Sequence, residues 1–201
     1  STWLSIIYPI WKIVNDRDIN IIIASDTGDQ AEMFLRLIKD EFEANERLID
    51  DFGAFYRKPP AGSPNVWRAT DITVLRTSRA KEPTIVCGGP GKRIVGRRAD
   101  LIIVDDPLND ENTENERQRA KTLRWFRKTL TPILNPETGR IIVIGTRKHP
   151  EDLHAELGRN GRWKQHVFRS IEDERALWPE RWPIARLLRE KEEIGSVIFA
   201  Q

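Results

Sequence analysis

A pair of adjacent carboxylates follows one of the most apolar segments of the sequence. Asp105 and Asp106 come directly after residues 101–104, four apolar residues typical of a strand buried in a parallel sheet. Open α/β sheets bind ligands at the carboxyl ends of their strands, where these two acids would lie. One carboxylate there can hold Mg²⁺ through its water shell while its neighbour orients an attacking water. The alternative is a pair of turn acids that cap the next segment, and the pair by itself is compatible with both.

A second strand end offers a glycine, a hydroxyl and a cation. The apolar residues 141–144 are followed by Gly145, Thr146 and Arg147. Glycine lets the backbone approach a ligand closely, and the threonine hydroxyl could sense a phosphate or the attacking water. Ordinary loops often begin in the same way. The position of this run, one helix after the acid pair, is the one that a nucleotide-hydrolysing sheet would use.

Two arginines and two hydroxyls are further candidates. From Arg97 or Arg98, just before the acidic strand, a guanidinium could reach a transferring phosphoryl group in its own subunit or in a neighbouring one. Pairing with Asp100 or with a helix carboxylate is the alternative. Ser1 and Thr2 precede a helix, which is what would remain if a phosphate-binding loop, Gly-x-x-x-x-Gly-Lys-[Ser/Thr], were cut after its lysine. A hydroxyl at that place ligates Mg²⁺, although any helix can begin with serine or threonine.

Apolar periodicity predicts the elements that would carry these residues. Strands alternate with helices along the chain, which indicates an α/β fold with a mostly parallel sheet flanked by helices. The expected strands are 19–25, 84–87, 101–105 and 140–145, with a hairpin within 66–75 after a loop at 58–64 and an edge strand at 163–168. The expected helices are 1–14, a long one from Asp26 or Thr27, 113–130 and 183–194.

Two sets of apolar side chains are expected to face the core. The first helix should carry Leu4, Ile7, Trp11 and Val14 on one stripe, with a kink at Pro9, and the long helix should bury Met33, Leu37, Ile38 and Phe42. We expect the tryptophans to be core anchors rather than base-stacking platforms, namely Trp3, Trp11, Trp125 and Trp163.

Composition indicates one globular domain of 201 residues with 39% hydrophobic residues. The 33 basic and 31 acidic residues nearly cancel, which argues against a purely electrostatic nucleic-acid binder, and the basic clusters at 92–93, 97–98, 117–127 and 181–191 are typical of solvated helix faces. No apolar run approaches the roughly 20 residues of a membrane-spanning helix. A single cysteine, Cys87, argues against a disulfide framework and fits a reducing cytoplasm.

With these residues in place, the sequence resembles the large terminase subunit of tailed phages and prophages. The likeness covers almost the whole chain. Each matching segment is short, and the specificity comes from the order and spacing of the segments. It comprises Ser1-Thr2-Trp3-Leu4-Ser5 with Tyr8-Pro9, residues 21–27 with Gln30-Ala31 and Phe34-Leu35, residues 96–107, Trp125-Phe126, Leu130-Thr131-Pro132, residues 139–147 with His149, Asp152-Leu153, residues 176–181, and Gly195-Ser196 with Phe199-Ala200-Gln201.

The resemblance implies a P-loop NTPase fold of the additional-strand type and an ATP-driven motor that works as a ring at the capsid portal. Asp105 would then be the Mg²⁺-organising Walker B acid and Asp106 the catalytic carboxylate, in a place where many such ATPases have the longer glutamate. Ser1 would ligate the magnesium, with Thr2 beside it on the phosphates. Residues 145–147 would be the coupling motif, Gly145-Thr146-Arg147. Arg97 is the leading arginine-finger candidate, followed by Arg98.

It also implies partners and a location. ATP and Mg²⁺ would be the cofactors, and double-stranded DNA, the portal protein, the small terminase subunit and further copies of the chain would be the partners. Assembly would take place in the cytoplasm of the bacterial host, without a membrane.

The chain departs from the family pattern at both ends. We expect one partial terminase-like ATPase domain over residues 1–201, without the first strand, the phosphate-binding loop and the C-terminal nuclease domain. Such a fragment should bind ATP poorly, and its sheet should be either gapped beside the acidic strand or less stable. The alternatives are a non-catalytic DNA-binding or assembly module with a degenerate NTPase fold, and a metal-dependent nuclease using Asp105, Asp106 and Asp110.

Overall fold

The computed structural model describes residues 1–58, 66–78, 80–91 and 94–199. The basic pair Lys92-Arg93, nearly all of the expected loop at 58–64, and Ala200-Gln201 lie outside the described residues. The chain divides into two units, Ser1–Gly145 and Thr146–Gln201, and each is described by itself.

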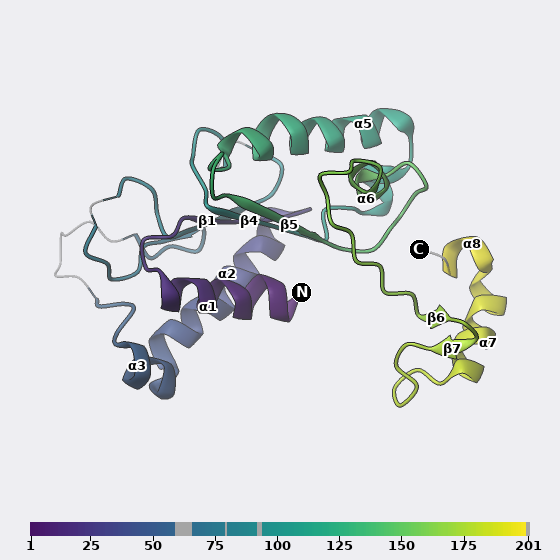
Figure 1. Cartoon of the computed structure of the whole chain (residues 1–201), viewed down its shortest axis with the longest axis horizontal. Coiled ribbons are helices and arrows are strands. Elements are labelled where there is room, and N and C mark those ends of the chain that lie inside the picture. Colours follow the sequence, from purple (N-terminus) through teal and green to yellow (C-terminus); the bar gives the residue numbers. More distant parts are fainter. Residues whose placement is uncertain (59–65, 79, 92–93, 200–201) are drawn as a thin grey trace. The chain divides into compact units, whose positions relative to one another are not determined.

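A five-stranded sheet forms the centre of the first unit (Figure 1). Its order is β2-β3-β1-β4-β5, with the last four parallel and β2 antiparallel at one edge. The strands are β1 (Ile21–Ser25), β2 (Asp71–Ile72), β3 (Ile85–Gly88), β4 (Leu101–Asp105) and β5 (Arg140–Ile144). All residues of β1, β3 and β4 are buried, as near-continuous apolar strands of a covered parallel sheet should be. The predicted α/β class with a mostly parallel sheet is confirmed.

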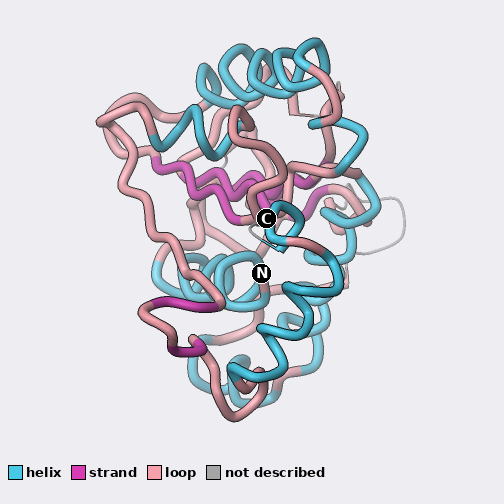
Figure 2. Tube along the Cα trace, turned by 90° about the vertical axis from the view of Figure 1, so that its right-hand side faces the viewer, coloured by secondary structure: helices cyan, strands magenta, loops and turns pink. Residues whose placement is uncertain are grey.

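Helices lie on both faces of this sheet. The N-terminal helix and α2 (Gly28–Ala44) lie on one face and α5 (Glu116–Trp125) on the other (Figure 1), and the view turned by 90° also shows the sheet between helices (Figure 2). The shorter helices of this unit are α3 (Glu46–Phe52), α4 (Asp110–Thr113), the π-helix η2 (Phe126–Leu130) and the 3₁₀ turn η3 (Thr131–Ile133). None of the described helices combines the length and the apolar character that crossing a bilayer requires.

The N-terminal helix turns a different face to the core than predicted. It begins as a π-helix, η1 (Thr2–Ile7), and continues as α1 (Tyr8–Asn15), so its side chains do not follow the 3.6-residue period used for the prediction. It buries Ser5, Pro9 and Ile13, whereas Trp3 and Trp11 are 75% and 54% exposed. The predicted stripe and the core role of these two tryptophans are therefore wrong. Leu4 and Ile7 are also exposed, and Val14, Trp125 and Trp163 are half-buried.

Helix α2 follows the expected start more closely. Thr27 caps it, its side chain accepting a hydrogen bond from Gln30 N at 3.3 Å. The face packed on the sheet consists of Ala31, Phe34, Leu35, Ile38 and Phe42. Met33 and Leu37 lie beside this face and are exposed, so the prediction was right for two of its four residues.

The acidic strand has a neighbour on each side. β1 pairs with one edge of β4 and β5 with the other, each over the full length of the strand. The expected gap beside the acidic strand is therefore wrong. Among the described residues of this sheet, the two end strands, β2 and β5, each have one strand partner, and β5 is the parallel one.

The second unit contains α6 (Leu153–Gly158), the hairpin β6 (Ile171–Glu172) and β7 (Arg175–Ala176), α7 (Ile184–Ile194) and α8 (Ser196–Phe199). The hairpin turn places Asp173 and Glu174 at φ 48° and 60°. The expected helix at 183–194 is confirmed, but the expected strand at 163–168 is wrong, because these residues pair with no strand among the described residues and all except Trp163 are exposed.

One backbone crossing at the carboxyl edge of the sheet requires a glycine. A Cβ on Gly89, just after β3, would lie 3.0 Å from Gly28 N and 3.1 Å from the carbonyl carbon of Thr27. We expect Gly89→Ala to lower the free energy of unfolding by about 1–3 kcal/mol, because backbone atoms cannot swing aside as a side chain could. Urea denaturation measures this. Gly91→Ala, whose added Cβ has no atom within 4 Å among the described residues beyond its chain neighbours, is the matched control and should change stability by less than about 0.5 kcal/mol.

Candidate functional site

Asp105, the last residue of β4, is a buried carboxylate held by hydroxyl groups. It is 1% exposed. Ser1 Oγ donates to its Oδ1 at 2.9 Å, and Ser5 Oγ donates to its Oδ2. Ser25 Oγ, at the end of the neighbouring strand β1, donates to its backbone carbonyl at 2.7 Å. These partners are all neutral, so the charge of an ionised Asp105 has no counter-ion among the described residues, and a cation at this place would be stabilised.

The helical start of the chain positions the two serines. Ser5 N donates to Ser1 O at 2.7 Å, which closes the first turn and sets both hydroxyls on the side that meets β4. The structure thus brings together Ser1 and Asp105, two predicted site residues 104 positions apart. Thr2 is exposed, and its predicted role at the phosphates stays a prediction.

Asp106 leaves the strand in an unusual backbone conformation. Its φ is 47°, in the left-handed region that costs a non-glycine residue about 1–2 kcal/mol. Its N–H donates to Ile144 O at 2.7 Å, so the backbone stays attached to β5 at this point. Its Oδ1 is buried and has no hydrogen-bond partner among the described residues. Strain and an unsatisfied buried oxygen at one residue are typical of a functional position rather than of a turn that only connects elements.

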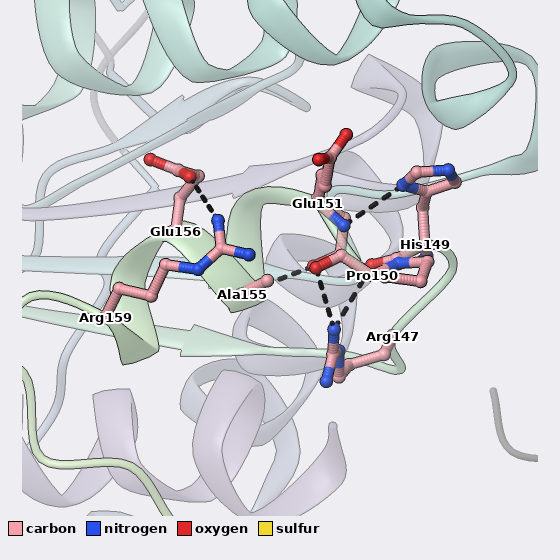
Figure 3. A network of polar contacts seen from close by, with 8 residues as sticks. Arg147, His149, Pro150, Glu151, Ala155, Glu156 and Arg159 are labelled. Carbon is pink, nitrogen blue, oxygen red and sulfur yellow. Dashed lines mark hydrogen bonds and ion pairs between the residues drawn. The ribbon is translucent and has the colours of Figure 1, made fainter.

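In the second predicted strand end, Gly145 lies at the edge of the sheet that carries the acid pair. Ile144 is in register with Asp105, so Gly145 follows at the same edge of the sheet. Thr146 and Arg147 belong to the second unit. There Arg147 Nη2 donates to the carbonyls of His149 and Pro150 at 3.4 and 3.2 Å (Figure 3). The guanidinium therefore stabilises a local turn, and the coupling role of residues 145–147 stays a prediction.

That turn is also held from inside by Asp152, which is 1% exposed. Its carboxylate accepts hydrogen bonds from the N–H groups of Lys148, His149 and Ala155, at 2.8, 3.1 and 2.9 Å. Asp152 is the N-cap of α6 and fixes the chain between β5 and this helix.

Arg97 and Arg98 lie at the opposite edge of the sheet. They precede β4, whose five residues alone separate them from Asp105 by about 13 Å. Arg97 Nη1 lies 3.5 Å from Glu82 Oε2, and Arg98 lines a cavity of about 350 Å³. Neither arginine is therefore placed to act on the acid pair of its own subunit. Action on a neighbouring subunit stays a prediction.

Asp100 was the alternative partner suggested for these arginines. In the structure its carboxylate has other partners. Its carboxylate accepts hydrogen bonds from Asn20 N at 3.0 Å and from Asn135 Nδ2 at 3.1 Å. These bonds tie together the segments that lead into β1, β4 and β5.

A network around Asp26 was missed from the sequence. Asp26 follows β1, and its two carboxylate oxygens accept hydrogen bonds from Asn109 Nδ2 at 2.6 Å and Asn112 Nδ2 at 2.9 Å. The two asparagines also cap α4 reciprocally. The Asn-x-x-Asn spacing could have predicted the helix cap. No sequence pattern indicated that Asn109 also binds Asp26, 83 positions earlier. The network fixes the segment that follows Asp106.

The site fits a magnesium ion with few protein ligands. Mg²⁺ in nucleotide sites keeps several waters and takes one or two carboxylates, and Asp105 with the Ser1 hydroxyl supplies such a set. Within the described residues no group of three or more His, Cys, Asp or Glu side chains could hold a metal ion. Asp105, Asp106 and Asp110 therefore do not form the metal cluster that the nuclease alternative requires.

The chain is an α/β protein with a mostly parallel sheet, consistent with a P-loop-like fold, and it has a buried acid at the carboxyl edge of the sheet with hydroxyls from the first helix beside it. The chain is similar to the terminase large subunit of Enterobacteria phage T3, with 25% identity over 190 residues. The alignment covers 92% of this chain and 29% of the phage T3 protein. No family model matches the chain. The predicted resemblance to terminase large subunits is thus confirmed.

The conformation of Asp106 leads to a stability prediction. Asp106→Gly removes both the left-handed strain and the unsatisfied oxygen, whereas Asp106→Ala keeps the strain. We expect the glycine variant to be more stable than the alanine variant by about 1 kcal/mol in urea denaturation. Equal stability of the two variants would contradict the left-handed backbone at this residue.

The Asp26 network can be tested in the same way. Asp26→Ala leaves the amides of Asn109 and Asn112 without their shared acceptor, and we expect a loss of about 2–4 kcal/mol. Asp40→Ala, an exposed acid on α2, is the control and should change stability by less than about 0.5 kcal/mol. Thermal unfolding followed by circular dichroism measures both, and equal shifts would contradict the network.

Proposed function

We propose that this chain is part of the ATP-hydrolysing motor domain of a viral DNA-packaging terminase, which couples Mg-ATP hydrolysis to the movement of double-stranded DNA into a prohead. The observation that carries the proposal is the hydrogen bond from Ser1 Oγ to the buried carboxylate of Asp105. It joins the start of the first helix, where anions are favoured, to an acid suited to Mg²⁺. The similarity to the phage T3 terminase supports the same assignment.

In this proposal each residue at the carboxyl edge of the sheet has a separate role in ATP hydrolysis. Asp105 and Ser1 would hold Mg²⁺, and Thr2 would contact the phosphates. The ion would neutralise charge on the phosphates during transfer. Asp106 would orient the attacking water, because its buried Oδ1 is an acceptor without a protein partner among the described residues and the hydrogen bond from its N–H to Ile144 O fixes its backbone. Aspartate reaches less far than glutamate, so the water must lie close to the end of β4.

The remaining assignments concern motion and assembly. Residues 145–147 would link the phosphate state to DNA movement, since Gly145 directly follows the strand paired with the acid pair. Arg97 or Arg98 would act on the nucleotide of a neighbouring subunit in a ring, because both lie at the edge of the sheet away from Asp106. Such a ring would assemble with the portal protein and the small terminase subunit in the cytoplasm of the bacterial host.

The proposal predicts the effect of one carboxylate on turnover. In the full-length protein we expect DNA-stimulated ATP hydrolysis, with Asp105→Asn lowering kcat by at least about 100-fold through loss of metal organisation. Asp110→Asn is the control. This exposed residue lies on α4 close in sequence to the acid pair, and its substitution should change kcat by less than about threefold.

Other outcomes separate the alternative functions. Full turnover in Asp105→Asn would contradict the motor proposal. DNA cleavage with Mn²⁺ and no nucleotide, lost in Asp110→Asn, would favour the nuclease. DNA binding without any ATP turnover in the full-length protein would favour the assembly module.

A further inference from the structure

The outer face of α5 and η2 carries a row of unpaired cations. Arg117, Lys121 and Arg124 follow one another at helical spacings of four and three residues, and Lys128 comes four residues later. All four are exposed, and none forms a hydrogen bond or ion pair with another described residue. The sequence has no acid between Glu116 and Glu137. We call these four residues the basic row.

The way this helix is held leaves the basic row open to solvent. No residue of α5 is buried. The helix is anchored beyond its end by Phe126 and Leu130 of η2, which are 2% and 0% exposed, and before its start by Thr113, whose carbonyl accepts from Arg119 Nη1 at 3.0 Å. α5 lies on the face of the sheet away from α1 and α2 (Figure 1).

The composition of this surface favours a polyanion over a protein partner. No large hydrophobic side chain is exposed among the described residues between Val95 and Val167, a stretch that includes α4, α5 and η2. Protein interfaces contain an apolar core, whereas nucleic-acid interfaces are polar and strongly positive. The three cations on α5 extend over about 10 Å of the helix, a length along which a DNA duplex presents about six phosphate charges.

The row is also directly connected to the acid pair. After Asp106 the chain passes through the α4 cap, where Asn109 and Asn112 bind Asp26, and continues into α5. The segment between the acid pair and the basic row is therefore short and is fixed by hydrogen bonds to Asp26.

From these observations we infer that the basic row, Arg117, Lys121, Arg124 and Lys128, binds the phosphate backbone of double-stranded DNA. Contacts of this kind are independent of sequence and depend on salt through counterion release. The inference rests on the proposed function in one respect, which is that DNA rather than another polyanion is the ligand. The surface itself follows from charge, exposure and the lack of apolar side chains.

The test measures binding of the 201-residue chain to a short labelled DNA duplex by fluorescence anisotropy, between about 50 and 200 mM salt. In the variant Arg117→Gln/Lys121→Gln/Arg124→Gln/Lys128→Gln we expect the affinity at about 100 mM salt to fall by at least about 100-fold. The slope of log K against log salt should fall by about 3 to 4, because each lost phosphate contact removes about 0.9 from it. Melting temperatures within about 3 °C of each other show that the variant folds.

A second variant controls for net charge. Arg36→Gln/Arg47→Gln/Arg57→Gln/Lys58→Gln removes four exposed cations of the same unit that lie outside the row. Its salt slope should stay within about 1 of the parent chain. Equal losses in the two variants, or no loss in the first, would overturn the inference. Displacement of the duplex by polyglutamate as readily as by unlabelled DNA of equal charge would also overturn it, in favour of an acidic protein partner.

Failure of this inference can be distinguished from failure of the motor proposal. DNA binding by the chain is measured without nucleotide, so its result does not depend on turnover. If turnover is lost in Asp105→Asn but the basic row does not bind DNA, only this inference falls. If the row binds DNA and Asp105→Asn retains full turnover, only the motor proposal falls.

Discussion

The buried carboxylate of Asp105 is the constraint on which the arrangement of the site depends. A charged group with almost no exposure at the end of a covered strand costs several kcal/mol unless its oxygens are satisfied. The two oxygens are satisfied by hydroxyls from one helical turn, Ser1 and Ser5, which fixes the position of the N-terminal helix at this edge. The identity of these small polar residues therefore follows from the acid that they contact, and a bound cation would complete the compensation.

Polar groups are sorted between the two edges of the sheet. The carboxyl edge gathers Asp105, Asp106 and the Asp26 network, with Gly89 allowing the backbone after β3 to approach the start of α2. The amino edge gathers Arg98 and the Asp100 hydrogen bonds that tie three strand starts together. Parallel strands place all of their carboxyl ends at one edge of the sheet and all of their amino ends at the other. A single covered sheet can therefore separate an acidic carboxyl edge from an amino edge that carries arginines.

The buried strands were predictable from the sequence, because strands covered on both faces must be apolar throughout and the acids could only come at their ends. The closeness of Ser1 to Asp105 was predicted through the family resemblance, and the structure shows it as a hydrogen bond. The face of the first helix was not predictable from a 3.6-residue period, because the helix begins with π-type turns. The Asp26 network joins residues 83 and 86 positions apart, and no local pattern encodes such pairs. The coupling role expected of Thr146 and Arg147, which belong to the second unit, stays a prediction.

The position of β5 at the end of the sheet has a consequence for handling the protein. Its sequence, Arg-Ile-Ile-Val-Ile, has high β-propensity and one charge, and four of its five residues are only partly buried. On the side away from β4 it has no strand partner among the described residues, so its amide and carbonyl groups there can template pairing with another strand. Self-association in concentrated samples should therefore begin at this edge, and a charged substitution on β5 would oppose it more effectively than one on the fully covered β4.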